Sequence, residues 1–262
     1  MNAAVEKRPK DIVIRLQHGQ LALKLREFNI AQETYKKILE RDPDSEAALM
    51  GLAEAKIGAR DALDAYRKIS ERLEKPKYKK HAMFNYWLGN AAVGLGKRDE
   101  AVKLWTKARD LDPSLAAPHV KVINANLEKG KLREATNAAQ KAYDSVKSEE
   151  KHLVRVAKAG IFLSNRQYAS AKLELEKALE QAPRNVDALM LYIDFLLHDE
   201  KLKTAEKKAR FARSLDPKNP KVLAGEAEVL LAQKKYNDAV ALMQEAVALD
   251  NLDHEMLLRA AA

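Results

Sequence analysis

Residues 82–115 read AMFNYWLGNAAVGLGKRDEAVKLWTKARDLDPSL, and the fold prediction starts from this stretch. Apolar residues recur at three- and four-residue spacing on both sides of a turn that contains Gly96. This spacing predicts two amphipathic helices, near 82–95 and 99–111. Pro113 follows the second helix and ends it, because proline lacks the amide hydrogen that helix continuation needs. The stretch therefore predicts a helical hairpin.

The second half of this hairpin recurs along the chain. An alanine preceded three residues earlier by a large side chain occurs at Ala31, Ala101, Ala135, Ala171, Ala205 and Ala239, at spacings of 70, 34, 36, 34 and 34 residues. A proline follows twelve residues later at Pro43, Pro113, Pro183 and Pro217. We place the missing copy around Ala62. Its internal turn is expected to be about three residues short, and its exit, EKPKYKK, about five residues long.

The alanine has a steric role in this prediction. Two helices of a hairpin cross there, and a larger side chain would force them apart. The composition also favours helices, because more than half of the 262 residues are Ala, Glu, Lys, Leu or Arg. Nine glycines and eight prolines are too few for a loop-rich β protein. We expect an all-α chain.

The sequence resembles the tetratricopeptide-repeat (TPR) family, whose 34-residue helix–turn–helix unit carries a Trp-Leu-Gly-Tyr-Ala-Phe-Ala-Pro pattern. Residues 82–115 match best, with Leu88, Gly89, Ala101, Trp105, Ala108 and Pro113 at the family's positions. The resemblance implies a right-handed α-solenoid of about seven units. We place these units at about 12–45, 46–81, 82–115, 116–151, 152–185, 186–219 and 220–253. Residues 1–11 are expected to be a flexible basic tail, and 254–262 a capping helix or the end of an excised domain.

By the same resemblance, the first helix of each unit lines a concave groove in which TPR proteins bind peptides or partner domains. The family's groove positions correspond to Gln17, Gln20, Lys24, Met83, Tyr86, Trp87, Asn90, Lys121, Asn124, Asp187, Met190, Asp194 and Glu228. Amides can pair with an extended backbone, and tryptophan supplies anchoring area. The first hypothesis is a non-enzymatic scaffold or adaptor that binds a protein or peptide. In one version it is the interaction domain of a larger regulatory, secretion or assembly protein.

Each group of groove residues also has a structural interpretation. Trp87 could pack in the core against the next hairpin, and Asn90 and Asn124 could be typical family residues without a binding role. Asp187, Asp194 and Glu228 could form a solvated face. The Lys, Asn and Arg set with which some TPR domains clamp chaperone tails is absent from the first unit, so a chaperone-tail clamp is disfavoured.

The net charge of +9 comes mainly from two places. One is Lys75, Lys77, Lys79 and Lys80, which flank Tyr78 in what we expect to be an extended loop. The other is 200–213, where Lys203, Lys207 and Arg210 share one helical face that we expect to be convex. Basic patches can meet phosphates or an anionic membrane, which gives the second hypothesis, a surface module that contacts nucleic acid or lipid.

The sequence shows no pattern of residues typical of an enzyme active site or a metal site. The chain has no cysteine, and its six histidines are dispersed without metal-ligand spacing. We expect no catalytic residue, metal or cofactor, although an activity in a flanking domain stays open. No run of eighteen apolar residues and no secretory signal is present, so we expect a cytoplasmic protein. Self-association also stays open, because open-ended solenoids can stack.

Overall fold

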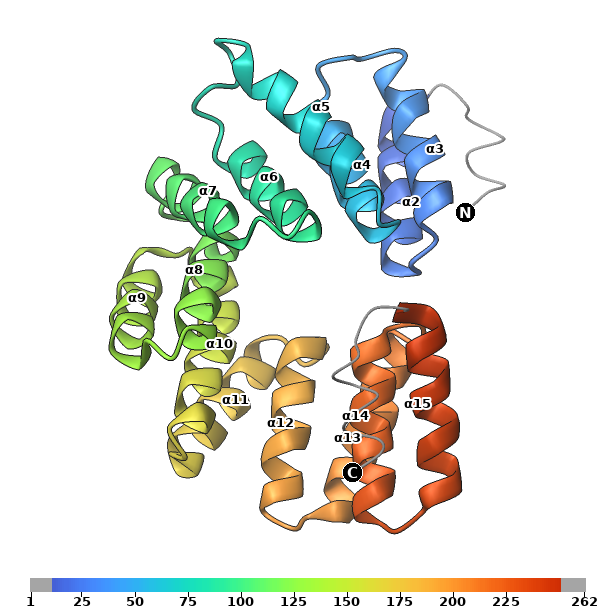
Figure 1. The fold of residues 1–262 in the computed structure, drawn as a ribbon, viewed down its shortest axis with the longest axis vertical. Coiled ribbons are helices and arrows are strands. Elements are labelled where there is room, and N and C mark those ends of the chain that lie inside the picture. The colour runs from blue at the N-terminus through green and yellow to red at the C-terminus, as the bar shows by residue number, and fades with distance from the viewer. Residues whose placement is uncertain (1–10, 251–262) are drawn as a thin grey trace. The chain divides into compact units, whose positions relative to one another are not determined.

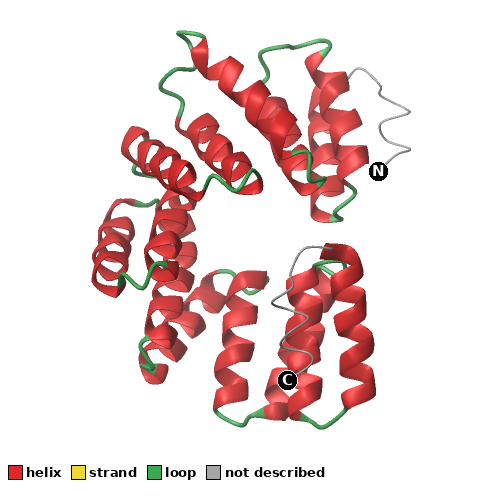
Figure 2. Ribbon diagram, in the orientation of Figure 1, coloured by secondary structure: helices red, strands yellow, loops and turns green. Residues whose placement is uncertain are grey.

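The computed structural model describes residues 11–250, and this part of the chain contains fourteen α-helices, one 3₁₀ helix and no strand (Figures 1 and 2). The seven helical hairpins are α2 (Ile12–Lys24) with α3 (Phe28–Leu39), α4 (Glu46–Gly58) with α5 (Ala62–Glu74), α6 (Ala82–Gly94) with α7 (Arg98–Leu111), α8 (Ala116–Glu128) with α9 (Leu132–Ser145), α10 (Lys151–Ser164) with α11 (Tyr168–Gln181), α12 (Val186–His198) with α13 (Leu202–Leu215), and α14 (Pro220–Ala232) with α15 (Tyr236–Asp250). The 3₁₀ helix η1 (Ser148–Glu150) precedes α10. The predicted all-α fold is therefore confirmed.

The two predicted end segments lie almost wholly outside residues 11–250. Of the predicted tail, only Asp11 is described, and its carboxylate caps α2 by accepting a 3.1 Å hydrogen bond from the amide of Ile14. The capping helix predicted at 254–262 lies outside the described residues. Within residues 11–250, no helix combines the length and the apolar character that crossing a bilayer requires.

The chain divides into two compact subdomains, Met1–Ala125 and Asn126–Ala262, with the boundary inside α8. We call them the N-terminal and C-terminal subdomains. In the first, α2 contacts α4 and α4 contacts α6; in the second, α10 contacts α12 and α12 contacts α14. First helices of successive hairpins are thus neighbours, and within each subdomain the hairpins stack in sequence as in an α-solenoid.

All seven hairpin turns share one backbone geometry. A residue with φ between 54° and 73° occurs in each, at Arg26, Arg60, Gly96, Gly130, Arg166, Glu200 and Lys234. The amide of the following residue donates to a carbonyl five residues before it, as Glu27 does to Ala22 at 2.9 Å and Lys97 to Ala92 at 2.9 Å. This is the Schellman motif, which satisfies carbonyls left unpaired at a helix end. The turns recur every 34 or 36 residues.

This register corrects the expectation for hairpin 2. Arg60 lies 34 residues after Arg26, so the turn has its full length and is not three residues short. The residue 34 positions after Ala31 is Ala65, which is 1% exposed, whereas Ala62 begins α5. Only two surplus residues therefore precede hairpin 3. The stretch DALDAY contains two alanines three residues apart, Ala62 and Ala65, and the sequence-based prediction selected the wrong one.

With the corrected register, one alanine occupies the same position in every second helix. These alanines are Ala31, Ala65, Ala101, Ala135, Ala171, Ala205 and Ala239, and none is more than 2% exposed. In hairpin 3 the close approach also involves a glycine. A Cβ added at Gly89 would lie 2.6 Å from Nε1 of Trp105, so the α6 backbone and the indole leave no room for a side chain.

The segment that leaves hairpin 2 is folded into turns and is not the extended loop that we expected. Tyr78 is 1% exposed, and its ring meets the edge of Phe84 at a centroid distance of 5.2 Å. Arg72 and Lys77 lie 5.3 and 4.9 Å from the centre of the Tyr78 ring. Arg72 also donates to Asp44 at 2.7 Å. Tyr78 therefore anchors the segment, and the surrounding lysines extend into solvent.

Substitution of glycine by alanine should have opposite effects on the free energy of unfolding in a turn and in a helix. Gly96 has φ +73° and open space where a methyl group would be added, so Gly96→Ala should lower the free energy of unfolding by about 1 kcal/mol through backbone strain alone. Gly160 is helical in α10 and a Cβ there meets only Leu127 at 3.8 Å, so Gly160→Ala should raise it by up to about 1 kcal/mol. Urea unfolding followed by circular dichroism measures both. Equal effects of the same sign would contradict the turn assignment.

Candidate functional site

The first helices of the N-terminal subdomain carry most of the side chains predicted to bind a partner. We call the following residues the first-helix surface: Gln17, Gln20 and Lys24 on α2, Met50 and Glu54 on α4, Met83, Tyr86, Trp87 and Asn90 on α6, and Lys121 and Asn124 on α8. All of them are exposed or half-buried. Since α2, α4 and α6 contact one another in order, their side chains can act on one partner.

Tyr86 and Trp87 form the aromatic centre of this surface. Their rings meet edge to face, with centroids 5.2 Å apart. Trp87 packs in part against the apolar cluster that contains Phe84 and, from α4, Ala53 and Met50. Tyr86 packs in part against the cluster that contains Val122 of α8. Each ring is half-buried, so each joins neighbouring helices and still presents part of its area to solvent.

Asn90 differs from Asn124 in what its amide contacts. The indole Nε1 of Trp105 donates to Oδ1 of Asn90 at 3.1 Å, and Trp105 is only 7% exposed. The ammonium of Lys121 lies 5.6 Å from the centre of the same indole ring. Asn124 is exposed on α8. Asn90 therefore holds a core tryptophan in place, whereas the amide of Asn124 faces solvent and can reach a ligand.

Met50 and Glu54 are members of this surface that the sequence reasoning missed. They lie 36 residues before Tyr86 and Asn90, the spacing that separates the turns of hairpins 2 and 3. The assignment of hairpin 2 as irregular hid this correspondence. Desolvation of its carboxylate raises the pKa of Glu54 above the ordinary value. Because Lys24 and Lys121 are also members of the surface, it carries both signs of charge.

The remaining predicted groove residues belong to the C-terminal subdomain. Asp187 and Asp194 are exposed on α12, and Glu228 is half-buried on α14. A Cβ added at Gly225 of α14 would lie 2.1 Å from Cε of Met190, so the Met190 side chain already rests on the α14 backbone. Met190 therefore packs between the two helices, while the acidic residues remain on the surface.

Both basic patches are exposed, and each includes carboxylates. Lys75, Lys77, Lys79 and Lys80 surround the buried Tyr78. Lys77 lies 3.6 Å from Asp44. On α13, Lys203 and Lys207 are exposed, and Arg210 forms an ion pair of 2.6 Å with Glu206. These pairs lower the positive potential that a polyanion would meet.

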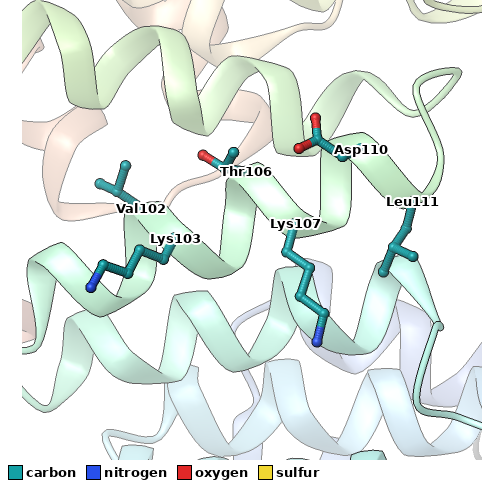
Figure 3. A pocket seen from close by; sticks show the side chains of 6 residues that line it. All are labelled: Val102, Lys103, Thr106, Lys107, Asp110 and Leu111. Atoms are coloured by element: carbon teal, nitrogen blue, oxygen red, sulfur yellow. The ribbon is translucent and has the colours of Figure 1, made fainter.

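No group of three or more histidine, cysteine, aspartate or glutamate side chains in the described part of the chain could hold a metal ion. An open surface pocket lies on α7 (Figure 3). Figure 3 shows Val102, Thr106 and Asp110 along one ridge of the helix, with Lys103, Lys107 and Leu111 along the next. Neither ridge carries a buried polar group aimed at the pocket, so we assign it no chemistry.

The repeat geometry agrees with comparisons to known proteins. The family model described as "Tetratricopeptide repeat" matches residues 16–68 and 156–220. The chain carries tetratricopeptide repeats. No curated protein sequence matches it significantly.

Three solved TPR-like structures illustrate the similarity in fold. A chain of the APC/C hetero-tetramer Cut9–Hcn1 aligns with 98% of this chain at 15% identity and a TM-score of 0.72. This chain spans about half, 49%, of that protein. A thermophilic TPR protein of Thermus thermophilus aligns with 71% of this chain and 100% of its own at 21% identity, with a TM-score of 0.60. A tetratricopeptide repeat protein of Parabacteroides merdae aligns with 95% of this chain and 96% of its own, at 12% identity and a TM-score of 0.63.

The different roles of Asn90 and Asn124 give a stability prediction. Asn90→Ala should cost about 1–3 kcal/mol, because it leaves the buried N–H of Trp105 without its acceptor. Asn124→Ala should change the stability by no more than about 0.5 kcal/mol, because its side chain is exposed. Thermal unfolding of both variants checks this. A loss as large for Asn124→Ala as for Asn90→Ala would show that the two amides have the same role.

Proposed function

We propose that this TPR protein is a non-enzymatic scaffold that binds a segment of a partner protein on the first-helix surface of its N-terminal subdomain. TPR domains generally act as protein–protein interaction scaffolds, which supports the broad assignment. The observation that supports this location is the edge-to-face pair of Tyr86 and Trp87, which keeps aromatic area accessible among amide side chains. The cytoplasmic location remains a prediction from the sequence.

The chemistry of this surface favours an extended segment with an apolar anchor. Half-buried aromatic rings offer contact area that is already ordered, so little conformational entropy is lost on binding. The exposed amides of Gln17, Gln20 and Asn124 can each donate to and accept from a peptide backbone. The mixed charges of Lys24, Lys121 and Glu54 favour a partner without a strong charge of its own.

One related structure supports a role in a larger assembly. The Cut9–Hcn1 structure is, by its title, a hetero-tetramer of the APC/C, and its similarity to this chain is in fold. A stack of hairpins of this kind can therefore serve within a multiprotein complex. We extend this to the present chain as part of the proposal, in which the acidic side chains of Asp187, Asp194 and Glu228 would form a separate contact.

Binding of nucleic acid or lipid by the basic patches is the weaker alternative. Asp44 and Glu206 already pair with Lys77 and Arg210, so neither patch presents its full charge. Salt separates the two functions, since contacts with phosphates weaken steeply with ionic strength and apolar contacts do not. Doubling the salt concentration should therefore leave most of the captured partner bound. A steep loss, also seen on reversing Lys203, Lys207 and Arg210 to glutamate, would favour the alternative.

The test of the proposed surface is a matched pair of double variants in affinity capture from native lysate. Tyr86→Ala with Asn124→Ala should reduce the captured partner at least about tenfold, because it removes an aromatic anchor and an exposed amide. Tyr236→Ala with Asn237→Ala makes the same two changes at exposed positions at the start of α15 and should leave capture unchanged. Mass spectrometry quantifies the captured proteins.

Helicity is the control for this comparison. Both double variants should keep the circular dichroism spectrum of the parent chain, so that lost capture reflects the surface and not unfolding. Capture that survives the first double variant, or that falls equally in both, would reject the first-helix surface as the binding site.

A further inference from the structure

The aromatic ring of Tyr143 in the C-terminal subdomain is surrounded by three cations. Lys151, Arg155 and Lys158 lie 4.6, 4.9 and 4.8 Å from the ring centre. Tyr143 is on α9, and the three cations are on one face of α10 at positions i, i+4 and i+7. All four side chains are half-buried. We call them the Tyr143 cluster, and all three charges lie within about 10 Å of one another.

The cluster replaces an apolar contact found earlier in the chain. The turns of hairpins 3 and 5, Gly96 and Arg166, are 70 residues apart. The counterparts of Tyr143 and Lys158 are therefore Leu73 and Leu88, which belong to one hydrophobic cluster between α5 and α6. The junction between α5 and α6 contains these two leucines, whereas the equivalent junction between α9 and α10 contains Tyr143 and Lys158. Core packing therefore does not account for these charges.

The connection before α10 fixes the position of the cluster. The usual proline is absent, and η1 leads directly into α10 at Lys151. Nε2 of Gln181 donates to the carbonyl of Ser148 at 2.6 Å, which ties η1 to α11. Nδ1 of His152 lies 2.9 Å from the carbonyl of Glu149. These contacts hold Lys151 at the first turn of α10 beside the Tyr143 ring.

The charges of the cluster are not balanced. Arg155 donates to Glu174 of α11 at 2.8 Å and also to the hydroxyl of Tyr143. Among the described residues, Glu174 is the one carboxylate that forms an ion pair with any of the three cations, and its partner is Arg155. Besides its contact with the ring, Lys158 donates to the neutral amide of Gln140 at 3.4 Å. Like charges at this spacing destabilise a helix, and the tyrosine ring offsets only part of the repulsion.

We propose that the Tyr143 cluster binds a single oxyanion group on an acidic segment of a protein partner. Lys151 and Lys158 donate to the oxyanion, while Arg155 stays held by Tyr143 and Glu174. Partial burial strengthens such charge-assisted hydrogen bonds, because water screens them less. A glutamate or aspartate carboxylate and a phosphoryl group share the required chemistry.

The surrounding carboxylates favour one anionic group over a nucleic acid. Asp144, bonded to Gln140, flanks the cluster on α9, Glu174 on α11 and Glu149 on η1. A repeating phosphate backbone would approach these carboxylates and be repelled, whereas an isolated oxyanion fits between them. This site shares no residue with the first-helix surface, so it does not depend on the function proposed above.

A double variant with a charge-matched control tests the proposal on the full chain. Lys151→Gln with Lys158→Gln removes two charges from the cluster, and Lys203→Gln with Lys207→Gln removes two from the exposed face of α13. The probes are a fluorescein-labelled peptide with a single glutamate, the same peptide with phosphoserine at that position, and the same peptide with glutamine there, compared by fluorescence anisotropy. The first variant should lose about tenfold in affinity for the acidic peptides, and the control less than about twofold.

The glutamine-substituted peptide, the thermal stability of the variants and a nucleic-acid probe provide three further measurements. The glutamine-substituted peptide should not bind, and tighter binding of the phosphoserine peptide would identify a phosphoryl group as the oxyanion. Without peptide, the cluster variant should be at least as stable to heat as the parent chain, because it removes like-charge repulsion. Equal losses in both variants, or no binding of the acidic peptides to the parent chain, would overturn the proposal. So would a single-stranded oligonucleotide that binds more tightly than the peptides and depends on Lys151 and Lys158.

Discussion

The close crossing of two helices at an alanine is the constraint on which each hairpin depends. Seven alanines, from Ala31 to Ala239, are almost fully buried at this position of the second helix. A methyl group lets the two backbones approach, and larger residues such as Trp105 then fill the space beside the crossing. The second helix and the turn complete the hairpin core. The identities of the side chains on the outward side of the first helix are therefore not determined by packing. Tyr86, Trp87 and Asn124 lie there.

Departures from the repeat occur where a tyrosine meets cations. In hairpin 2, Arg72 occupies a position at which Ala108 lies in hairpin 3, and it is accommodated by Tyr78 and by an ion pair with Asp44. At the junction before α10, Tyr143 receives three cations with a single paired carboxylate, Glu174. In the first arrangement the tyrosine ring is buried and both cations, Arg72 and Lys77, lie within ion-pair distance of Asp44, so we interpret it as structural. The second is half-exposed and unbalanced, which is why we propose a ligand for it.

The sequence predicted the hairpins because their spacing reflects local physics, helix periodicity and a turn of fixed geometry. It failed in hairpin 2, where neither Ala62 nor Ala65 follows a large side chain three residues earlier and only the turn at Arg60 shows that Ala65 is the equivalent residue. That error also hid Met50 and Glu54. The contacts of Asn90 with Trp105 and of Met190 with Gly225 join different helices, so no periodicity could reveal them. Which face of the molecule binds a partner is likewise a prediction that packing alone does not decide.

Hydroxyl-radical footprinting of the chain with and without its captured partner tests that choice of face most directly. The first helix α6 carries Met83, Tyr86 and Trp87, and the second helices carry Phe211 on α13 and Tyr236 on α15, so reactive side chains report on both faces. We expect partner binding to protect the three α6 side chains from oxidation and to leave the oxidation of Phe211 and Tyr236 unchanged. Protection of Phe211 or Tyr236, with Tyr86 and Trp87 still oxidised at their free rates, would contradict it.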